Sequence, residues 1–166
     1  MKRRDFLITT VALAIAPVLS HRAHAGEKRL EMNTKIEKLE LSEAQWRTRL
    51  TPEQFDILRE EGTERSHSSP LNHEKRQGSF VCAGCELPLF TSAMKYDSGT
   101  GWPSFFDTLP GRVETKLDFK LILPRTEYHC ARCGGHQGHV FNDGPQPTGQ
   151  RYCNNGLALK FVPERG

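Results

Sequence analysis

Two cysteine pairs of the form CxxC constrain the fold of this chain more than any other feature. Cys82 and Cys85 form the first pair, and Cys130 and Cys133 form the second. Turns that present two thiolates each are typical of tetrahedral metal sites. One zinc ion bound by all four cysteines would join segments separated by residues 86–129. It would close a long loop and stabilise a single domain.

Three other interpretations of the cysteine pairs stay open from spacing alone. The pairs could form two disulfides if the protein reaches an oxidising compartment. They could be thioredoxin-like redox motifs, although the βαβ context of those motifs is missing. They could hold one iron in a rubredoxin-like site. We predict one structural zinc per chain because four thiolates at this spacing form a closed tetrahedral site.

The fifth cysteine, Cys153, is left over from the two pairs. His136 and His139 lie upstream in HQGHVFND, and Arg151 and Asn155 flank the cysteine in RYCNN. Neighbouring cations can lower the pKa of a thiol and make it a nucleophile, and a histidine can give a proton to a leaving oxygen. A buried, inert thiol with structural histidines is the alternative interpretation.

A tryptophan between glycine and proline is a second candidate for a functional residue. Trp102 lies in SGTGWPSFF, residues 98–106. Its neighbours fix the ring in a turn, where it either fills the core or forms an aromatic wall for a small apolar group such as a methyl.

Residues 1–25 have the pattern of an export signal. A basic head at 2–4 precedes an apolar run at 6–19 and a small-residue cleavage site, Ala23-His24-Ala25. Arg3-Arg4 followed by DFL matches a twin-arginine signal, which exports folded bacterial proteins. The apolar run is too short to cross about 30 Å of hydrocarbon as a helix, so we expect no stable membrane anchor. The predicted location is the periplasm.

The predicted signal also accounts for the net charge. The full chain carries +3, and residues 1–25 contain four basic residues and one acidic residue. The remainder is therefore close to neutral. A nucleic-acid partner is not expected, because such binding needs a basic surface that neutralises phosphates.

The local patterns predict a mainly β (α+β) fold with short helices first. Residues 42–45 and 51–54 match capping boxes, and Gly62 is a stop signal. Short β runs separated by turn residues follow, and Asp118 between two of them predicts a hairpin near 113–124 with its turn at Asp118. The runs are 79–82, 113–117, 119–124, 126–130, 138–141 and 156–162. We divide the chain into a signal peptide (1–25), a charged arm (26–41) and one domain (42–166).

Together these motifs resemble the methionine sulfoxide reductases of the B type, which reduce the R epimer of methionine sulfoxide. The resemblance covers about residues 42–162. It implies that the domain is a methionine-R-sulfoxide reductase domain with two small antiparallel sheets. The matching segments are GTERSHSSPLN (62–72), FVCAGCELPLF (80–90), KYDSGTGWPSF (95–105), YHCARCGGHQGHVFNDGP (128–145) and RYCNNGLALKF (151–161).

The resemblance also implies a role for each candidate residue. Cys153 would be the nucleophile, Trp102 would pack the sulfoxide methyl, and His139 would give a proton to the sulfoxide oxygen. His136 would be the second active-site histidine, and Arg151 and Asn155 would orient the substrate and the nucleophile. The structural zinc would be held by Cys82, Cys85, Cys130 and Cys133.

The partners follow from the same resemblance. The substrates would be oxidised proteins that carry methionine-R-sulfoxide, and the activity would serve protein repair under oxidative stress. Cys153 would pass through a sulfenic acid, which a thioredoxin-like or other thiol reductant would reduce. A monomer is expected.

The chain departs from the family pattern at Thr100. Many members carry a cysteine at this place in SGxGWPSF, where it resolves the sulfenic acid as a disulfide. With the other four cysteines committed to zinc, we expect no internal resolving cysteine and direct reduction by an external thiol. Ser66-His67-Ser68 also departs from the more usual proline-phenylalanine.

Overall fold

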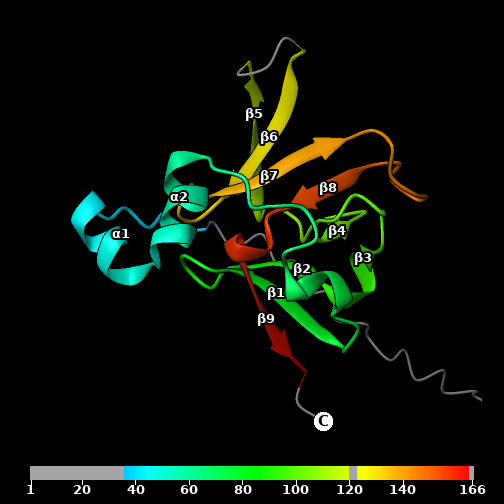
Figure 1. The fold of residues 1–166 in the computed structure, drawn as a ribbon, viewed down its shortest axis with the longest axis horizontal. Helices are drawn as coiled ribbons and strands as arrows, with labels where there is room; N and C mark the ends of the chain where they lie inside the picture. Colours follow the sequence, from blue (N-terminus) through cyan, green and yellow to red (C-terminus); the bar gives the residue numbers. More distant parts are fainter. Residues whose placement is uncertain (1–35, 120–122, 165–166) are drawn as a thin grey trace, which may run out of the picture. The chain divides into compact units, whose positions relative to one another are not determined.

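The protein folds into two antiparallel β-sheets preceded by two short helices, as the sequence predicts. The computed structural model describes residues 36–119 and 123–164. One sheet has the order β2-β1-β9 and the other β3-β4-β8-β7-β6-β5 (Figure 1). The elements are α1 (Glu43–Arg49), α2 (Pro52–Glu60), η1 (Pro70–His73), β1 (Gly78–Cys82), β2 (Pro88–Thr91), η2 (Ser92–Met94), β3 (Lys95–Tyr96), β4 (Ser104–Phe105), β5 (Val113–Asp118), β6 (Arg125–Cys130), β7 (His136–Phe141), β8 (Arg151–Asn154), η3 (Gly156–Ala158) and β9 (Leu159–Pro163).

Both helices begin at the predicted capping boxes. Ser42 accepts a hydrogen bond from the Gln45 amide, and the Gln45 side chain accepts one from the Ser42 amide. Thr51 and Gln54 repeat this exchange at the start of α2. Each box satisfies two backbone donors that a helix N-terminus otherwise leaves unpaired. The helix α2 ends at Glu60, and its C-cap residue Glu61 has a left-handed conformation directly before Gly62.

The prediction of a turn at Asp118 is wrong. The strand β5 continues through Asp118, which pairs with Arg125 across the hairpin. The Asp118 carboxylate accepts a hydrogen bond from the Arg125 guanidinium, so this acidic residue is held within the strand. The predicted strand 119–124 is also wrong where it is described: Phe119, Leu123 and Pro124 are not in a strand. Residues 120–122 lie outside the described residues.

Aromatic side chains from both sheets meet in one core. Phe80 of β1 and Phe90 of β2 pack on Phe105 of β4, with ring centroids 4.9 and 4.0 Å apart. Tyr128 of β6 completes the group at 6.3 Å from Phe90. All four are fully buried, and each contributes about 2–3 kcal/mol by leaving water. The core thus fixes the β2-β1-β9 sheet against the sheet that carries Cys153.

The predicted signal peptide (1–25) lies outside the described residues, as does most of the predicted arm. Of the arm, residues 36–41 are described, and Leu39 donates a backbone hydrogen bond to the Arg132 carbonyl at 2.8 Å. Within residues 36–119 and 123–164, no helix is long and apolar enough to span a membrane.

Candidate functional site

The four cysteines of the CxxC pairs gather into one buried cluster. Their sulfur atoms all lie within 4.8 Å of one another. The closest contacts run between the pairs: Cys82 Sγ lies 3.7 Å from Cys133 Sγ, and Cys85 Sγ lies 3.5 Å from Cys130 Sγ. All are free thiols and not disulfides. The turn after β1 and the turn after β6 therefore face one another.

This cluster fits a tetrahedral metal ion. Zinc–sulfur bonds of about 2.3 Å require sulfur–sulfur edges of about 3.8 Å, close to the observed separations. A nitrogen donor also points at one of the sulfurs, as thiolate ligands favour. The Gln137 side chain donates to Cys82 Sγ at 3.5 Å. The donor set of four sulfurs suits zinc.

Cys153 lies apart from this cluster, at a cavity of about 120 Å³. Its register partners across the sheet are His139 on β7 and Ser104 on β4. Paired residues of antiparallel strands project on the same face, so these side chains stand in one row. Besides Cys153, the cavity is lined by three predicted site residues, Trp102, His139 and Asn155. Its lining also includes residues without a predicted role, among them Thr63, Arg125 and Phe141.

The environment of the Cys153 thiol acts on its pKa in both directions. Burial raises the pKa above its ordinary value. The Arg151 guanidinium and the Thr100 hydroxyl lower it, and so offset part of the effect of burial. Burial therefore disfavours the charged thiolate of Cys153, and Arg151 and Thr100 reduce this unfavourable effect.

The sequence predicts Arg151 as a site residue but does not predict Asp143 as its hydrogen-bond partner. Arg151 is 8% exposed and does not line the cavity. Its Nε and one terminal nitrogen each donate to Asp143, with both distances 2.8 Å. This two-point pairing holds the guanidinium beside Cys153.

The two predicted histidines have different surroundings. His139 lines the cavity, and its Nε2 lies 2.8 Å from Asp118 Oδ2. The same oxygen accepts a hydrogen bond from Arg125 at 2.7 Å. This carboxylate therefore fixes the orientation of the His139 ring.

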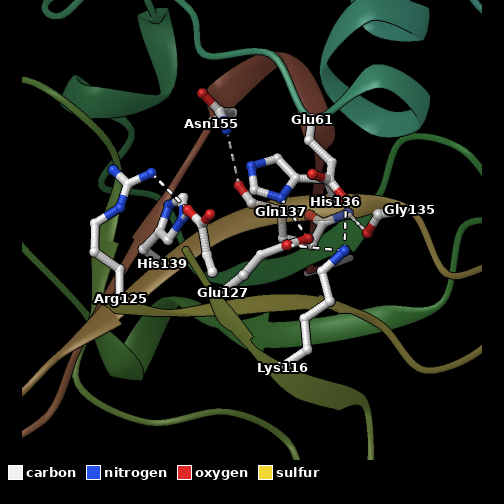
Figure 2. A network of polar contacts seen from close by, with 10 residues as sticks. Glu61, Lys116, Arg125, Glu127, Gly135, His136, Gln137, His139 and Asn155 are labelled. Carbon is white, nitrogen blue, oxygen red and sulfur yellow. Dashed lines mark hydrogen bonds and ion pairs between the residues drawn. The ribbon is translucent and has the colours of Figure 1, made fainter. Parts of the chain in front are cut away.

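His136 belongs to a charge network that runs from the buried Glu127 to the exposed Lys116 (Figure 2). Its Nδ1 lies 2.8 Å from Glu127, whose other oxygen contacts Lys116, and Lys116 also contacts Glu61. Burial lowers the pKa of His136, although Glu127 partly opposes this effect. Its Nε2 is buried and has no hydrogen-bond partner among the described residues. His136 does not line the cavity, and its ring packs edge-on against His139 at 5.6 Å.

Asn155 and Trp102 are both tied to Glu64. The Asn155 side chain accepts a hydrogen bond from the Glu64 amide, and the Trp102 indole donates to the Glu64 carbonyl, both at 3.1 Å. The Glu64 carboxylate accepts from the amides of Gly156 and Leu157, at 2.5 and 3.0 Å. One buried residue thus connects the tryptophan to the loop that follows Cys153.

We predict that Glu64→Gln lowers stability by about 1–3 kcal/mol, because an amide nitrogen would then face a backbone N–H. We also expect kcat/KM to fall about tenfold or more, since Trp102 and Asn155 would shift. Urea unfolding and steady-state assays measure the two effects. Glu40→Gln is the matched control because Glu40 is exposed. Equal behaviour of the two variants would contradict the role of Glu64.

Sequence reasoning missed the carboxylates that support this site. Glu127, Asp118 and Asp143 bind His136, His139 and Arg151 in turn. Asp143 lies in HQGHVFND and Glu64 in GTERSHSSPLN, so both could have been singled out there. Glu127 and Asp118 become visible only once the strands are paired.

The fold combines a candidate thiol site at Cys153 with four cysteines that are positioned to bind a metal ion. A model of the SelR domain matches residues 50–163. The chain is 50% identical over 128 residues to the peptide methionine sulfoxide reductase MsrB of Methanosarcina mazei, covering 76% of this chain and 91% of that protein. The identity is 51% over 127 residues to the MsrB of Agrobacterium fabrum, with 76% and 94% covered. It is 48% over 134 residues to the MsrB of Leptospira interrogans, with 80% and 100% covered.

The chain therefore belongs to the methionine-R-sulfoxide reductase B family, and the membership predicted from its motifs is confirmed. It is an oxidoreductase of that family.

Proposed function

We propose that this protein reduces methionine-R-sulfoxide in oxidised proteins to methionine, with Cys153 as the nucleophile. The observation that carries this proposal is the register of β7 and β8, which pairs Cys153 with His139 at a cavity lined by Trp102 and Phe141. Apolar rings suit the methyl and methylene groups on the sulfoxide sulfur, and the histidine suits its oxygen.

Each step of the reaction then has a candidate residue. His139, held by Asp118, gives a proton to the sulfoxide oxygen, which makes the sulfur electrophilic. The Cys153 thiolate attacks that sulfur, and the oxygen passes to the cysteine. Methionine leaves reduced by two electrons, and Cys153 becomes a sulfenic acid. Arg151 stabilises the thiolate, and Asn155 and His136 position the loop and the row of side chains around it.

Regeneration of Cys153 needs an external reductant. The other four cysteines belong to the metal cluster, and Thr100 stands where many relatives have a resolving cysteine. The reductant is thioredoxin-like or another dithiol, and its two thiol groups supply two electrons. These thiols become a disulfide, and the sulfenic oxygen leaves as water.

The remaining proposals concern structure and location. One zinc held by Cys82, Cys85, Cys130 and Cys133 joins the two turns and stabilises the domain without taking part in the reaction. Residues 1–25 direct export through the twin-arginine pathway to the periplasm. The protein acts as a monomer, without nucleic acid or a membrane anchor.

A single-turnover experiment tests the proposed function. The reduced protein, mixed with each sulfoxide epimer of a methionine peptide and no reductant, should yield about one methionine per chain from the R epimer alone. A sulfenic-acid probe such as dimedone should then label Cys153. Reduction of the S epimer alone would overturn the assignment. A stoichiometric internal disulfide on Cys153 would overturn the proposed regeneration.

A further inference from the structure

A row of side chains crosses the larger sheet from its β5 edge to Cys153. The register pairs neighbouring strands β5, β6, β7 and β8 in turn at Lys116, Glu127, His139 and Cys153. Paired residues of antiparallel strands project on the same face of a sheet. His136, also on β7, packs its ring against the His139 ring with the centroids 5.6 Å apart. An acidic and a basic residue therefore stand next to the two histidines of the site.

The hydrogen bonding of His136 indicates a neutral ring with its proton on Nδ1. Nδ1 lies 2.8 Å from the Glu127 carboxylate, which can accept a hydrogen bond but cannot donate one while it is charged. Nε2 is buried and has no hydrogen-bond partner among the described residues. A charged ring would carry a second N–H at this atom, with no described group to accept it. Burial, which lowers the pKa of His136, acts in the same direction.

Glu127 by itself would favour the charged form of His136. The two side chains are each 3% exposed, and a buried negative charge in contact with an imidazole attracts a second proton to it. Lys116 Nζ lies 3.1 Å from the other oxygen of Glu127 and supplies the opposite charge (Figure 2). Glu61 also contacts Lys116, and the hydrogen bonds to Glu61 and Glu127 raise the pKa of the lysine, so its charge persists.

Lys116 is the cation that opposes Glu127 in these surroundings. The charged and titratable groups described around His136 come from four segments: Glu61 after α2, Lys116 of β5, Glu127 and His129 of β6, and His139 of β7. His129 lies 3.5 Å from a different carboxylate, that of Glu114. A substitution at Lys116 therefore changes the charge balance at Glu127 and leaves the groups that touch His136 in place.

We propose that Lys116 and Glu127 are positioning residues for the reaction: Glu127 orients the His136 ring through Nδ1, and Lys116 balances the Glu127 charge so that His136 stays neutral beside His139. Two positive rings with centroids 5.6 Å apart would repel each other. A neutral His136 lets His139 carry the proton for the sulfoxide oxygen without this repulsion. The inference rests on the proposed role of His139 as the proton donor.

NMR of the ring nitrogens in the zinc-loaded protein with ¹⁵N-labelled histidine tests the charge of His136 directly. At about pH 7 the wild type should show a neutral ring with its proton on Nδ1. The signals of His136 are identified by their loss in His136→Gln. In Lys116→Met the midpoint of the His136 titration should rise by about one pH unit, because Glu127 loses its counter-charge. Lys116→Arg keeps the charge and should restore the wild-type midpoint.

A second substitution separates the charge of Glu127 from its hydrogen bond. Glu127→Gln keeps an oxygen that can accept from Nδ1 but removes the charge. In the double variant Lys116→Met with Glu127→Gln, the midpoint should therefore return to the wild-type value or fall below it. Lys160→Met is the matched control, because Lys160 is as exposed as Lys116 and lies 3.2 Å from a surface carboxylate, Glu86.

The pH profile of the single-turnover rate with a methionine-R-sulfoxide peptide gives the second readout. Between the His136 midpoints of the two proteins, only the variant Lys116→Met has a charged His136, and it should be about threefold or more slower than the wild type. Above both midpoints the two rates should be equal. A loss of structure alone would lower the rate equally at every pH.

Four results would overturn the proposal: a wild-type ring that is charged or carries its proton on Nε2, an unchanged midpoint in Lys116→Met, no reversal in the double variant, or a Lys116→Met rate that is unchanged or lowered equally at every pH. Lys116→Gln is measured alongside, so that a folding defect of the methionine variant does not decide the result. The NMR experiment uses no sulfoxide. Its failure is therefore distinguishable from a failed assignment of the enzyme activity, which the epimer experiment tests.

Discussion

Replacing Cys153 with serine will lower the single-turnover rate of methionine-R-sulfoxide reduction by at least about 1,000-fold, as removal of a covalent nucleophile does in other enzymes. A serine hydroxyl is barely ionised near neutral pH, whereas a thiol is within reach of ionisation. Serine oxygen also cannot take up the sulfoxide oxygen in a stable form, because the product would be a peroxide. Methionine formed per chain, separated by chromatography, measures the rate.

The same variant should keep its fold and its metal. Cys153 is half-buried at the cavity and is not part of the four-cysteine cluster. We therefore expect about one zinc per chain and a melting temperature close to that of the wild type. Retention of more than a tenth of the wild-type rate in Cys153→Ser would show that another group is the nucleophile.

Removal of the metal should unfold the domain. Zinc bound by four thiolates in small domains contributes about 10–16 kcal/mol, which equals or exceeds the usual stability of a domain of this size. A strong chelator under reducing conditions, or the variant Cys130→Ser, should abolish the cooperative thermal transition seen by circular dichroism. Returning zinc to the chelated wild type should restore it.

Cys130→Ser and Cys153→Ser form a matched pair for this test. Both exchange one sulfur for one oxygen, but only the first removes a member of the metal cluster. A chelated protein that still melts cooperatively at the wild-type temperature would contradict a structural metal. One zinc and one titratable thiol per chain would exclude the alternatives of two disulfides and of bound iron.

The parts of the site that could be predicted are those with a local signal. The CxxC spacing indicates the four cysteines that cluster as a possible metal site, and Cys153 is found because it is left over from the two pairs. Both helix starts are encoded by a four-residue capping box. Trp102 is marked by its glycine and proline neighbours. In each case the physical cause lies within a few residues of the effect.

The rest depends on contacts between distant segments. Glu127 reaches His136, and Asp118 reaches His139, only because β5, β6 and β7 pair in one register. Asp118 also looked like a turn residue, since aspartate is common in turns. It instead lies within β5, where it pairs with Arg125. No short window of sequence contains both Asp118 and His139.

The size of the cavity at Cys153 bears on which methionines this enzyme can repair. A volume of about 120 Å³ accommodates the end of one side chain. The order in which oxidised residues are repaired should therefore follow how far each one protrudes. Oxidised methionines in extended or unfolded segments would be reduced first, and those in intact cores would be reduced only after local opening exposes them.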